Sequence, residues 1–353
     1  MRIVVNDIAA SSGGALTVLR SFQQYIVEND KENEWIFLLN DKYIDETENV
    51  RINILGKVKS NWLNRIKFDL HSGKKYISSL NPDVVFSLQN TITFGLSYPQ
   101  VVYMHQSIPF QKIKKFSFFR SEERKLAIYQ YIIGEIIKKS IKKADKVIVQ
   151  TKWIKDSVIE FTNIASHNVI DVFPNFENCS EYKKDNLFEK QNFFYPAAKL
   201  IYKNHQCIYD ACEILEKKGV SDYKISLTIE EENTVENINY LGELSFESVL
   251  ENYNTSTLIF PSFIETVGLP MLEARQMGTI ILASDCPFSR EVLDGYANAY
   301  YFNPFKPNEL ADLIVRVLNG EIVRETIDEL DNKNSDCWQT IIDIIIKAGK
   351  NNN

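Results

Sequence analysis

Short apolar runs alternate with longer amphipathic stretches along almost the whole chain. Runs of four or five aliphatic or aromatic residues, such as 2–5 and 257–260, are typical of strands that are buried on both faces. The stretches between them repeat apolar residues every three or four positions, as a helix with one buried face does. This order of strand, helix and strand predicts parallel sheets that are covered by helices on both sides.

The same pattern sets the expected elements and their grouping into domains. In the first half, strands are expected at 2–5, 35–39, 53–55, 84–88, 101–105, 146–150 and 169–173, and helices at 14–28, 62–80, 121–143 and 153–161. In the second half, strands are expected at 192–196, 224–229, 240–241, 257–260, 279–283 and 299–302, and helices at 205–217, 245–252, 270–277, 307–318 and 337–348. The polar stretch 175–189 is the expected linker. The fold class is therefore α/β, with two doubly wound, Rossmann-like domains at 1–175 and 190–330, and with a segment 331–353 whose helix is a candidate to return to the first domain.

Composition and charge narrow the classes of function. The chain has 353 residues and a net charge of −7, which disfavours nucleic acid as a partner. Its five cysteines are odd in number and none are spaced C-x-x-C, so neither a disulfide framework nor a structural zinc site is expected. The sequence starts directly with a strand-like run and has no apolar run long enough for a membrane span. We therefore expect a cytoplasmic protein that does not cross the bilayer.

The most informative motif follows the expected strand 257–260. Its loop leads into a helix that Pro270 can open, and the amides at a helix N-terminus attract phosphate. Gly268 lets the backbone approach a ligand closely. Glu265 in the loop and Glu273, expected in the first turn of the helix, suit sugar and ribose hydroxyls on either side of a diphosphate. The alternative is that Glu273 only complements the helix dipole and that Glu265 is solvated.

The spacing E-x7-E and the stretch Thr-Val-Gly-Leu-Pro at 266–270 resemble the E-[FT]-x-G-L-P motif of retaining GT-B glycosyltransferases of the family-4 type. The resemblance implies two Rossmann-like domains that face a cleft, a nucleotide-sugar donor and retention of anomeric configuration. It also implies that the first glutamate contacts the donor sugar, that the loop amides contact sugar and phosphate, and that the second glutamate holds the ribose. By position, these roles fall on Glu265, on Thr266, Val267, Gly268 and Leu269, and on Glu273.

A second motif follows the expected strand 192–196. The family usually has G-R-L-x-x-x-K there, with an arginine and a lysine that neutralise the donor diphosphate. Lys203 matches the lysine, whereas Ala198 stands at the arginine position and Lys199 is its candidate substitute. A lysine lacks the planar fork of an arginine, so the substitution is not equivalent. The alternative is a pair of solvated lysines beside a helix start.

Two further candidates lie in the first half. Gly13 and Gly14 follow the opening strand and precede a helix, where backbone amides can face a phosphate, although paired glycines are also common in plain turns. The family has a similar glycine pair that closes over the donor phosphates. His105 lies at the end of the expected strand 101–105, where related enzymes carry a histidine near the donor sugar; the alternative is a structural histidine.

The segment 101–150 is basic although the chain as a whole is acidic. It contains eleven lysines and arginines against four acidic residues. Within it, residues 112–120 interleave cations with aromatic side chains, which suits anionic lipid headgroups. The segment is therefore a candidate for contact with the inner face of the cell membrane, and the alternative is a solvated helix face.

Together these features predict a glycosyltransferase for bacterial surface polysaccharide, such as capsule, exopolysaccharide or O-antigen. Its expected partners are a nucleotide-sugar donor, bound by the domain at 190–330, and a saccharide acceptor, lipid-linked in our interpretation and bound by the domain at 1–175. No D-x-D sequence occurs, so no metal is expected, and the predicted catalytic residues are Glu265, Lys203 and His105. Three alternatives remain: a catalytically inactive homologue, a Rossmann-type dehydrogenase or nucleotide-sugar epimerase, and a two-lobed sugar-binding protein. The dinucleotide fingerprint that the Rossmann-type enzyme needs is absent from residues 11–20.

Overall fold

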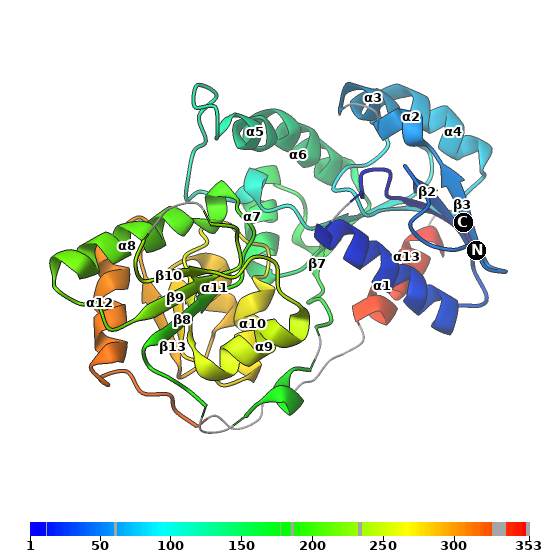
Figure 1. Ribbon diagram of the computed structural model, residues 1–353. Coiled ribbons are helices and arrows are strands. Elements are labelled where there is room, and N and C mark those ends of the chain that lie inside the picture. The colour runs from blue at the N-terminus through cyan, green and yellow to red at the C-terminus, as the bar shows by residue number, and fades with distance from the viewer. Residues whose placement is uncertain are drawn as a thin grey trace. The chain divides into compact units, whose positions relative to one another are not determined.

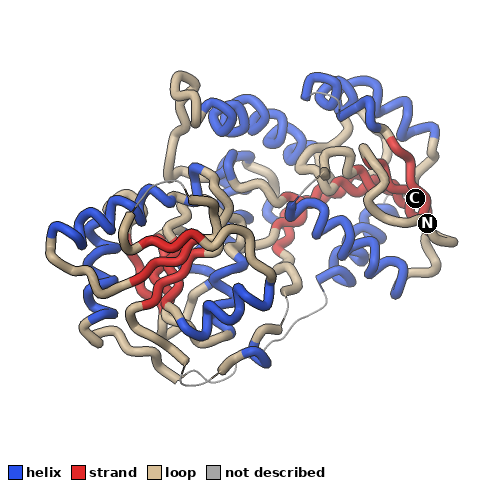
Figure 2. Tube along the Cα trace, in the orientation of Figure 1, coloured by secondary structure: helices blue, strands red, loops and turns tan. Residues whose placement is uncertain are grey.

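The computed structural model describes residues 1–11, 13–59, 62–176, 178–184, 187–231, 235–326 and 337–350. The described chain divides into two compact units. The first unit comprises Met1–Arg120, Arg124–Asn175 and the last helix, and the second comprises Ser121–Glu123 and the described part of Phe176–Lys333. In each unit, helices flank a central sheet (Figure 2).

The sheet of the first unit has the order β3-β2-β1-β4-β5-β6-β7, and all its strand pairs are parallel. Its strands are β1 (Arg2–Asn6), β2 (Glu34–Leu39), β3 (Val50–Ile54), β4 (Val84–Ser87), β5 (Gln100–Met104), β6 (Lys146–Val149) and β7 (Val169–Asp171). The helices between them are α1 (Gly13–Asn29), α2 (Gly56–Lys59), α3 (Trp62–Lys67), α4 (Gly73–Ser79), α5 (Arg124–Ala127), α6 (Gly134–Lys143) and α7 (Lys152–Thr162).

Alternate residues of these strands enter cores on opposite faces of the sheet, as the two-residue period of a strand requires. Ile3 and Val5 of β1 pack on one face with α1, whereas Val4 packs on the other face with residues near α4. Further along the sheet, β5 and β6 send alternate residues to a core that they share with α6 and α7. Nearly all these strand residues are buried, which explains why the strands read as continuous apolar runs.

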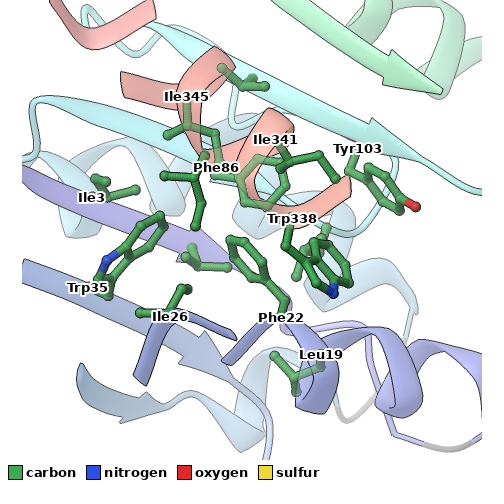
Figure 3. Close-up of a cluster of buried hydrophobic side chains, with 14 of the residues drawn as sticks. Ile3, Leu19, Phe22, Ile26, Trp35, Phe86, Tyr103, Trp338, Ile341 and Ile345 are labelled. Carbon is green, nitrogen blue, oxygen red and sulfur yellow. The ribbon is translucent and has the colours of Figure 1, made fainter. Parts of the chain in front are cut away.

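The last helix, α13 (Cys337–Lys350), lies beside α1 in the first unit although more than 300 residues separate the two in sequence (Figure 1). Trp338 places its ring 5.0 Å from that of Phe22 and donates its indole N–H to Ser21 Oγ at 2.9 Å. Ile341 and Ile345 are buried in the same cluster (Figure 3). The core on this face of the sheet is therefore closed by the C-terminal end of the chain.

Two helices of the first unit contain a π-helical turn, so the uninterrupted helices expected at 62–80 and 121–143 are wrong in detail. The turn Phe68–Ser72 separates α3 from α4, and Ile128–Ile133 separates α5 from α6. Each wide turn ends at a glycine. A Cβ on Gly73 would lie 2.7 Å from the Phe68 carbonyl oxygen, and one on Gly134 would lie 3.0 Å from Pro109 Cβ and 3.1 Å from the Tyr129 oxygen. Because glycine has no Cβ atom, these two positions avoid the close contacts that any other residue would make with the wider turns.

The second unit has a sheet of order β10-β9-β8-β11-β12-β13, again with every pair parallel. Its strands are β8 (Asn192–Tyr195), β9 (Lys224–Leu227), β10 (Ile238–Tyr240), β11 (Thr257–Phe260), β12 (Ile281–Ser284) and β13 (Ala299–Phe302). Its α-helices are α8 (His205–Lys217), α9 (Phe246–Thr255), α10 (Leu269–Gln276), α11 (Pro287–Val292) and α12 (Pro307–Leu318). The short helices α2 and α11 were not expected from the sequence, and several other boundaries shift by one to three residues.

No helix in the described ranges is both long and apolar enough to cross a membrane. All five cysteines lie within those ranges, are buried, and form no disulfide with one another.

Candidate functional site

The strand order of the second sheet reverses between β8 and β11, which are neighbours although they are far apart in sequence. In open α/β sheets, ligands bind beyond the carboxyl ends of the strands at such a switch point. The segments that follow these two strands are residues 196–204 and 261–268. They contain the motifs that the sequence singled out around Lys203 and Glu265.

At this switch point, Lys203 and Glu265 form an ion pair. The Lys203 Nζ atom lies 2.6 Å from Glu265 Oε1, and the same oxygen accepts a hydrogen bond from Ser262 Oγ, also at 2.6 Å. The side chains are mostly enclosed, with exposed fractions of 18% for Lys203 and 13% for Glu265. The sequence predicted roles for both residues, and the structure brings them into direct contact. Ser262 opens the same motif but had no predicted role.

Backbone contacts hold the two segments together. The Phe263 amide donates to the Tyr202 carbonyl oxygen at 3.0 Å, which joins the loop after β11 to the one after β8. The buried Tyr195 hydroxyl donates to the Lys203 carbonyl oxygen at 2.8 Å. Asn204, in the left-handed region with φ of 60°, donates its side-chain amide to the Pro261 oxygen at 3.1 Å and to the Pro304 oxygen at 2.8 Å. These hydrogen bonds fix the backbone that carries Lys203 and Glu265.

Tyr202 lies next to the pair, with its ring centroid 5.9 Å from Lys203 Nζ. Burial, and secondarily the negative charge of Glu265, raise the pKa of Tyr202 to about 12. Tyr202 consequently stays a neutral phenol at physiological pH and offers a hydroxyl group rather than a charge.

The loop after β11 ends at Gly268, which caps α10. Its φ of +87° is in the left-handed region, and a Cβ there would lie 2.7 Å from Met271 Cε. Only glycine fits this corner without strain. The side chain of Val267 is buried and that of Leu269 is 45% exposed. Val267 can therefore reach a ligand only through its backbone, as can Gly268, while Thr266 is half-buried.

Glu273 does not lie in the first turn of its helix, so that expectation is wrong. Because Gly268 turns the chain into α10 at Leu269, Glu273 falls in the second turn, beyond the range of the strongest dipole effect. Its Oε2 atom accepts a hydrogen bond at 2.9 Å from the hydroxyl of Tyr253, a fully buried residue of α9. Tyr253 was not singled out in the sequence.

The remaining predicted residues lie elsewhere. Lys199 and Ala198 are exposed on the loop after β8. Gly13 and Gly14 begin α1 in the first unit, with φ of +58° at Gly13, and a Cβ on either glycine would meet nothing within 4 Å. Their backbone is therefore uncrowded, as an anion site would need.

His105 follows β5 in the first unit. Its amide donates to Asn90 Oδ1 at 2.9 Å, and its ring nitrogen Nδ1 is buried. Burial, together with the nearby Arg65 charge, lowers the pKa of His105 to about 4, so the imidazole is neutral at pH 7. Close by, Asp69 in the first π-helical turn is a buried carboxylate that no pattern in the sequence had marked.

Two neutral groups hold the carboxylate of Asp69. Gln89 Nε2 donates to Oδ1 at 3.2 Å, and Thr91 Oγ1 donates to Oδ2 at 2.8 Å. Burial raises the pKa of Asp69 to about 6 despite these contacts. The signal available in the sequence was the polar run Gln-Asn-Thr directly after the buried strand β4. Within the described ranges, no group of three or more histidine, cysteine or acidic side chains is arranged to hold a metal ion.

The family comparison concerns the second unit, which contains this site. Residues 180–333 match the family model described as glycosyl transferases group 1. The matched stretch contains Lys203, Glu265, Gly268 and Glu273, that is, the whole switch-point site of the second unit. This part of the chain is therefore similar to glycosyl transferases group 1. The family-4 assignment and retention of configuration stay predictions.

Individual relatives agree with this class. The O-antigen chain mannosyltransferase RfbU of Salmonella typhimurium is 28% identical over 178 residues, which are 48% of this chain and 50% of that protein. The match thus spans about half the length of this curated relative. Among solved structures, WaaG, a glycosyltransferase involved in lipopolysaccharide biosynthesis, superposes with a TM-score of 0.69 at 12% identity over 97% of this chain and 99% of that one.

HepE of Anabaena, solved with UDP-glucose, superposes with a TM-score of 0.60 at 13% identity over 100% of this chain and 98% of that one. At such low identity, these structural likenesses bear on the fold alone. They confirm the two parallel-sheet, Rossmann-like domains of the GT-B class that the sequence predicted.

Proposed function

We propose that this chain is a metal-independent glycosyltransferase that moves a sugar from a nucleotide-sugar donor to a saccharide acceptor with retention of configuration. In this proposal the acceptor is lipid-linked, the product is a bacterial surface polysaccharide of the O-antigen or capsule type, and the reaction takes place at the cytoplasmic face of the membrane. Support comes from the match of residues 180–333 to glycosyl transferases group 1 and from the likeness to an O-antigen mannosyltransferase.

The observation that carries the proposal is the cluster of Lys203, Glu265 and Ser262 at the switch point of the second sheet. It combines a cation suited to a diphosphate with a carboxylate suited to sugar hydroxyls. Gly268 and Leu269 add backbone amides at the N-terminus of α10, where such groups favour anionic ligands.

Lys203 would stabilise the diphosphate that leaves the sugar. Without a ligand, its ammonium group is paired with Glu265 at 2.6 Å, so donor binding must redirect the lysine from the carboxylate to a phosphate oxygen. That exchange keeps the buried ammonium paired in both states and avoids the cost of an isolated charge. Charge stabilisation of this kind commonly supplies the largest share of catalysis.

Glu265 would orient the donor sugar rather than attack it. One of its oxygens already accepts hydrogen bonds from both Lys203 and Ser262, and these contacts hold the carboxylate in a fixed orientation. We therefore expect no covalent glycosyl adduct on Glu265. Mass spectrometry of the protein after incubation with donor alone checks this point, and an adduct on Glu265 would refute the assigned role.

Glu273 would bind the ribose. Tyr253 fixes its carboxylate through a hydrogen bond to one oxygen, and carboxylate oxygens accept hydrogen bonds from the hydroxyls of a diol. The fixed orientation reduces the entropy that donor binding would otherwise cost.

The basic-aromatic segment 112–120 supports a membrane-bound acceptor. Phe119 is 96% exposed and Phe118 is 40% exposed, an unusual position for two neighbouring aromatic side chains on a protein surface. Lys114 and Lys115 lie just before them in sequence. Apolar anchors flanked by cations suit an anionic bilayer surface, where each cation contributes about 1 kcal/mol.

Flotation with phosphatidylserine-containing and neutral phosphatidylcholine vesicles tests this surface. The full chain is expected to float only with the anionic vesicles, and a variant with Lys114→Glu and Lys115→Glu is expected to stay at the bottom. The matched control carries Lys217→Glu and Lys218→Glu, a pair of adjacent lysines at the end of α8. Equal flotation of both double variants would remove the support for membrane contact.

The donor site is tested by thermal shift against UDP, GDP and dTDP and their sugars, followed by donor turnover with and without EDTA. One nucleotide is expected to stabilise the protein by about 2.7 kcal/mol at 100 times its Kd, and turnover is expected to survive EDTA. Stabilisation without any turnover would favour an inactive homologue, to which the exposed Ala198 at the usual arginine position points. Stabilisation by NAD alone would favour the Rossmann-type alternative.

A further inference from the structure

The second unit contains a cavity of about 840 Å³ at the amino ends of its strands, at the edge of the sheet opposite the proposed donor site. Its lining comes from the segment before β8, from Gly278 between α10 and β12, and from the end of α12 with the residues after it. The volume is within the range of pockets that bind small molecules.

Helix α10 separates this cavity from the switch-point site. The helix begins directly after the loop that carries Glu265, and it ends at its Met277 cap, next to Gly278 of the cavity. Eight residues of α-helix span about 12 Å. The cavity is therefore distinct from the proposed donor site, and an inference about it does not depend on the proposed function.

Positive charge predominates around the cavity. Among the described residues that line it, the cations are Lys183, Lys184, Lys190 and Arg324, against the single carboxylate of Glu325. The excess is local, because the whole chain has a net charge of −7. Within the described part of the chain, none of the three lysines has an acidic partner. A cavity lined by one sign of charge attracts ions of the opposite sign, here anions.

Two of these cations approach the same point. A Cβ atom on Gly278 would lie 3.7 Å from Lys183 Nζ and also 3.7 Å from Arg324 Nη2. The Arg324 guanidinium donates to the carbonyl oxygens of Met277 and Gly278 at the end of α10, the latter at 2.9 Å. The Lys183 ammonium has no hydrogen-bond partner in the described ranges. An anion placed there would offset the repulsion between the two cations and accept hydrogen bonds from the lysine.

Two buried asparagines fix the backbone around the cavity. Asn254, which is 1% exposed, accepts a hydrogen bond from the Lys184 amide at 2.9 Å, and its carbonyl oxygen accepts one from Arg324 Nη1 at 3.1 Å. Asn298, which is fully buried, donates to the Gly278 oxygen at 3.0 Å and also to the backbone after α12. A lining that is already fixed lowers the entropy that a ligand must lose on binding.

The rest of the lining is largely apolar. Phe188 is half-buried, and its ring centroid lies 5.9 Å from the central carbon of the Arg324 guanidinium. Val317 and Ile322 are buried, whereas Val323 is 63% exposed. Lysines bind phosphate as point charges, and an aromatic ring beside them offers a surface for the carbon part of a phosphate ester.

We propose that this cavity is a second ligand site, which binds a small organic phosphate. The doubly charged phosphate group contacts Lys183 and Lys184, and an apolar or aromatic part of the same molecule packs against Phe188. An anion with one charge gains less from the lysines, and inorganic phosphate gains nothing from the apolar lining.

Saturation-transfer NMR on the full chain at pH 7.5, with phenyl phosphate as the probe, tests this site. Phenyl sulfate has the same ring with one charge, and inorganic phosphate, measured by competition, has the charge without the ring. Phenyl phosphate is expected to bind at least fivefold more tightly than either of them. Equal binding of phenyl sulfate or of inorganic phosphate would overturn the inference.

Two pairs of adjacent lysines provide matched variants. Lys183 and Lys184 line the cavity, whereas Lys217 and Lys218 lie at the end of α8 and have acidic partners on their own helix and on α12. The double variant with Lys183→Gln and Lys184→Gln is expected to bind phenyl phosphate at least tenfold more weakly. The double variant with Lys217→Gln and Lys218→Gln is expected to lose less than twofold. Equal losses in the two double variants would overturn the assignment.

Two single variants locate the two parts of the ligand. Lys203→Ala, at the proposed donor site, is expected to change the affinity for phenyl phosphate less than twofold, and a tenfold loss there would place the probe at the switch point and refute the inference. Phe188→Ala is expected to reduce the preference for phenyl phosphate over inorganic phosphate to less than twofold. An unchanged preference in Phe188→Ala would refute the apolar contact.

Discussion

Each sheet of this protein reverses its strand order once between neighbouring strands, at β1 and β4 in the first unit and at β8 and β11 in the second. Both switch points collect polar side chains, but of different character. In the second unit, Lys203 and Glu265 are paired at 2.6 Å and mostly enclosed. In the first unit, amides surround a neutral His105 and the buried Asp69.

The comparison of the two units separates the location of a site, which the sheet topology determines, from its charge, which the side chains determine. The parallel sheet determines where a site can form, because the carboxyl ends of all its strands lie along the same edge and ligands bind beyond them at the switch point. The residues that follow the strands set the charge of each site: the Lys203–Glu265 pair in one unit, and carboxylates, amides and a neutral imidazole in the other.

Removing the cation from the charged site should have the largest effect. Lys203→Ala is expected to lower kcat for donor turnover on the order of 10²–10³-fold, because the leaving diphosphate loses a positioned charge. Steady-state kinetics with the donor found in the nucleotide screen measure it. Lys199→Ala, on the exposed part of the same loop, is the control and is expected to cost less than tenfold. Equal losses would mean that the ion pair with Glu265 does not mark the catalytic lysine.

Asp69 and His105 in the first unit should make the free energy of unfolding depend on pH. Because the pKa of Asp69 is raised to about 6, the folded protein holds a proton that the unfolded chain has lost, and stability falls as pH rises from about 4 to 6. Because the pKa of His105 is lowered to about 4, the unfolded chain binds the extra proton below about pH 6.5, and stability falls as pH drops.

The two slopes are opposite, and each amounts to at most about 3 kcal/mol. Relative to the unmodified chain, Asp69→Asn should therefore lose stability toward low pH, and His105→Gln should lose it toward high pH. Urea unfolding from pH 4.5 to 7.5 measures both. Parallel curves for the two variants would show that the groups are not shielded as the structure implies.

A smaller effect is expected at the corner that leads into α10. Gly268→Ala places a Cβ at φ of +87° and against Met271, and the backbone strain alone costs roughly 1–2 kcal/mol. Gly219→Ala is the matched control, since its φ is +71° and its surroundings are open. Both variants should lower Tm, but only Gly268→Ala should also weaken nucleotide binding. Unchanged nucleotide affinity in Gly268→Ala would remove the loop from the donor site.

The smallest effect is expected from the hydroxyl that fixes Glu273. Tyr253→Phe deletes one hydrogen bond and should raise the donor KM roughly fivefold, or about 1 kcal/mol, with little change in kcat. Tyr296→Phe removes a comparable buried hydroxyl, which donates to the Thr279 oxygen at 2.7 Å, and serves as the control. A KM shift of the same size in both variants would point to a general loss of stability.

Much of this organisation could be predicted from the sequence, and the limits have physical causes. Most buried strands could be predicted from their apolar runs. Lys203 and Glu265 could be predicted because the segments after two of these strands resemble the family motifs. Helix α11 was missed because its six residues are too few to show a helical period. The π-helical turns were missed because Gly73 and Gly134 are ambiguous in sequence and gain meaning only from the backbone atoms beside them.

Residues that are buried beside the sites, or that hold a site residue in place, were harder to predict than the site residues themselves. Asp69 is held by Gln89 and Thr91, about twenty positions away, so only the tertiary fold reveals its burial. Tyr253 reaches Glu273 from a different helix. Glu273 falls in the second turn rather than the first because α10 begins one residue earlier than expected, and the left-handed conformation of Gly268 cannot be predicted from a glycine alone.

The placement of α13 has a consequence for biosynthesis. A ribosome adds residues in order, and the domains of a chain generally fold as they emerge, the N-terminal one first. Here the first unit lacks Trp338 and its isoleucine neighbours until translation has passed the entire second unit. Until α13 has been synthesised, Phe22 and the apolar face of the first strands lack the side chains that bury them. The first unit, although synthesised first, can therefore complete its core only after the second unit has been synthesised.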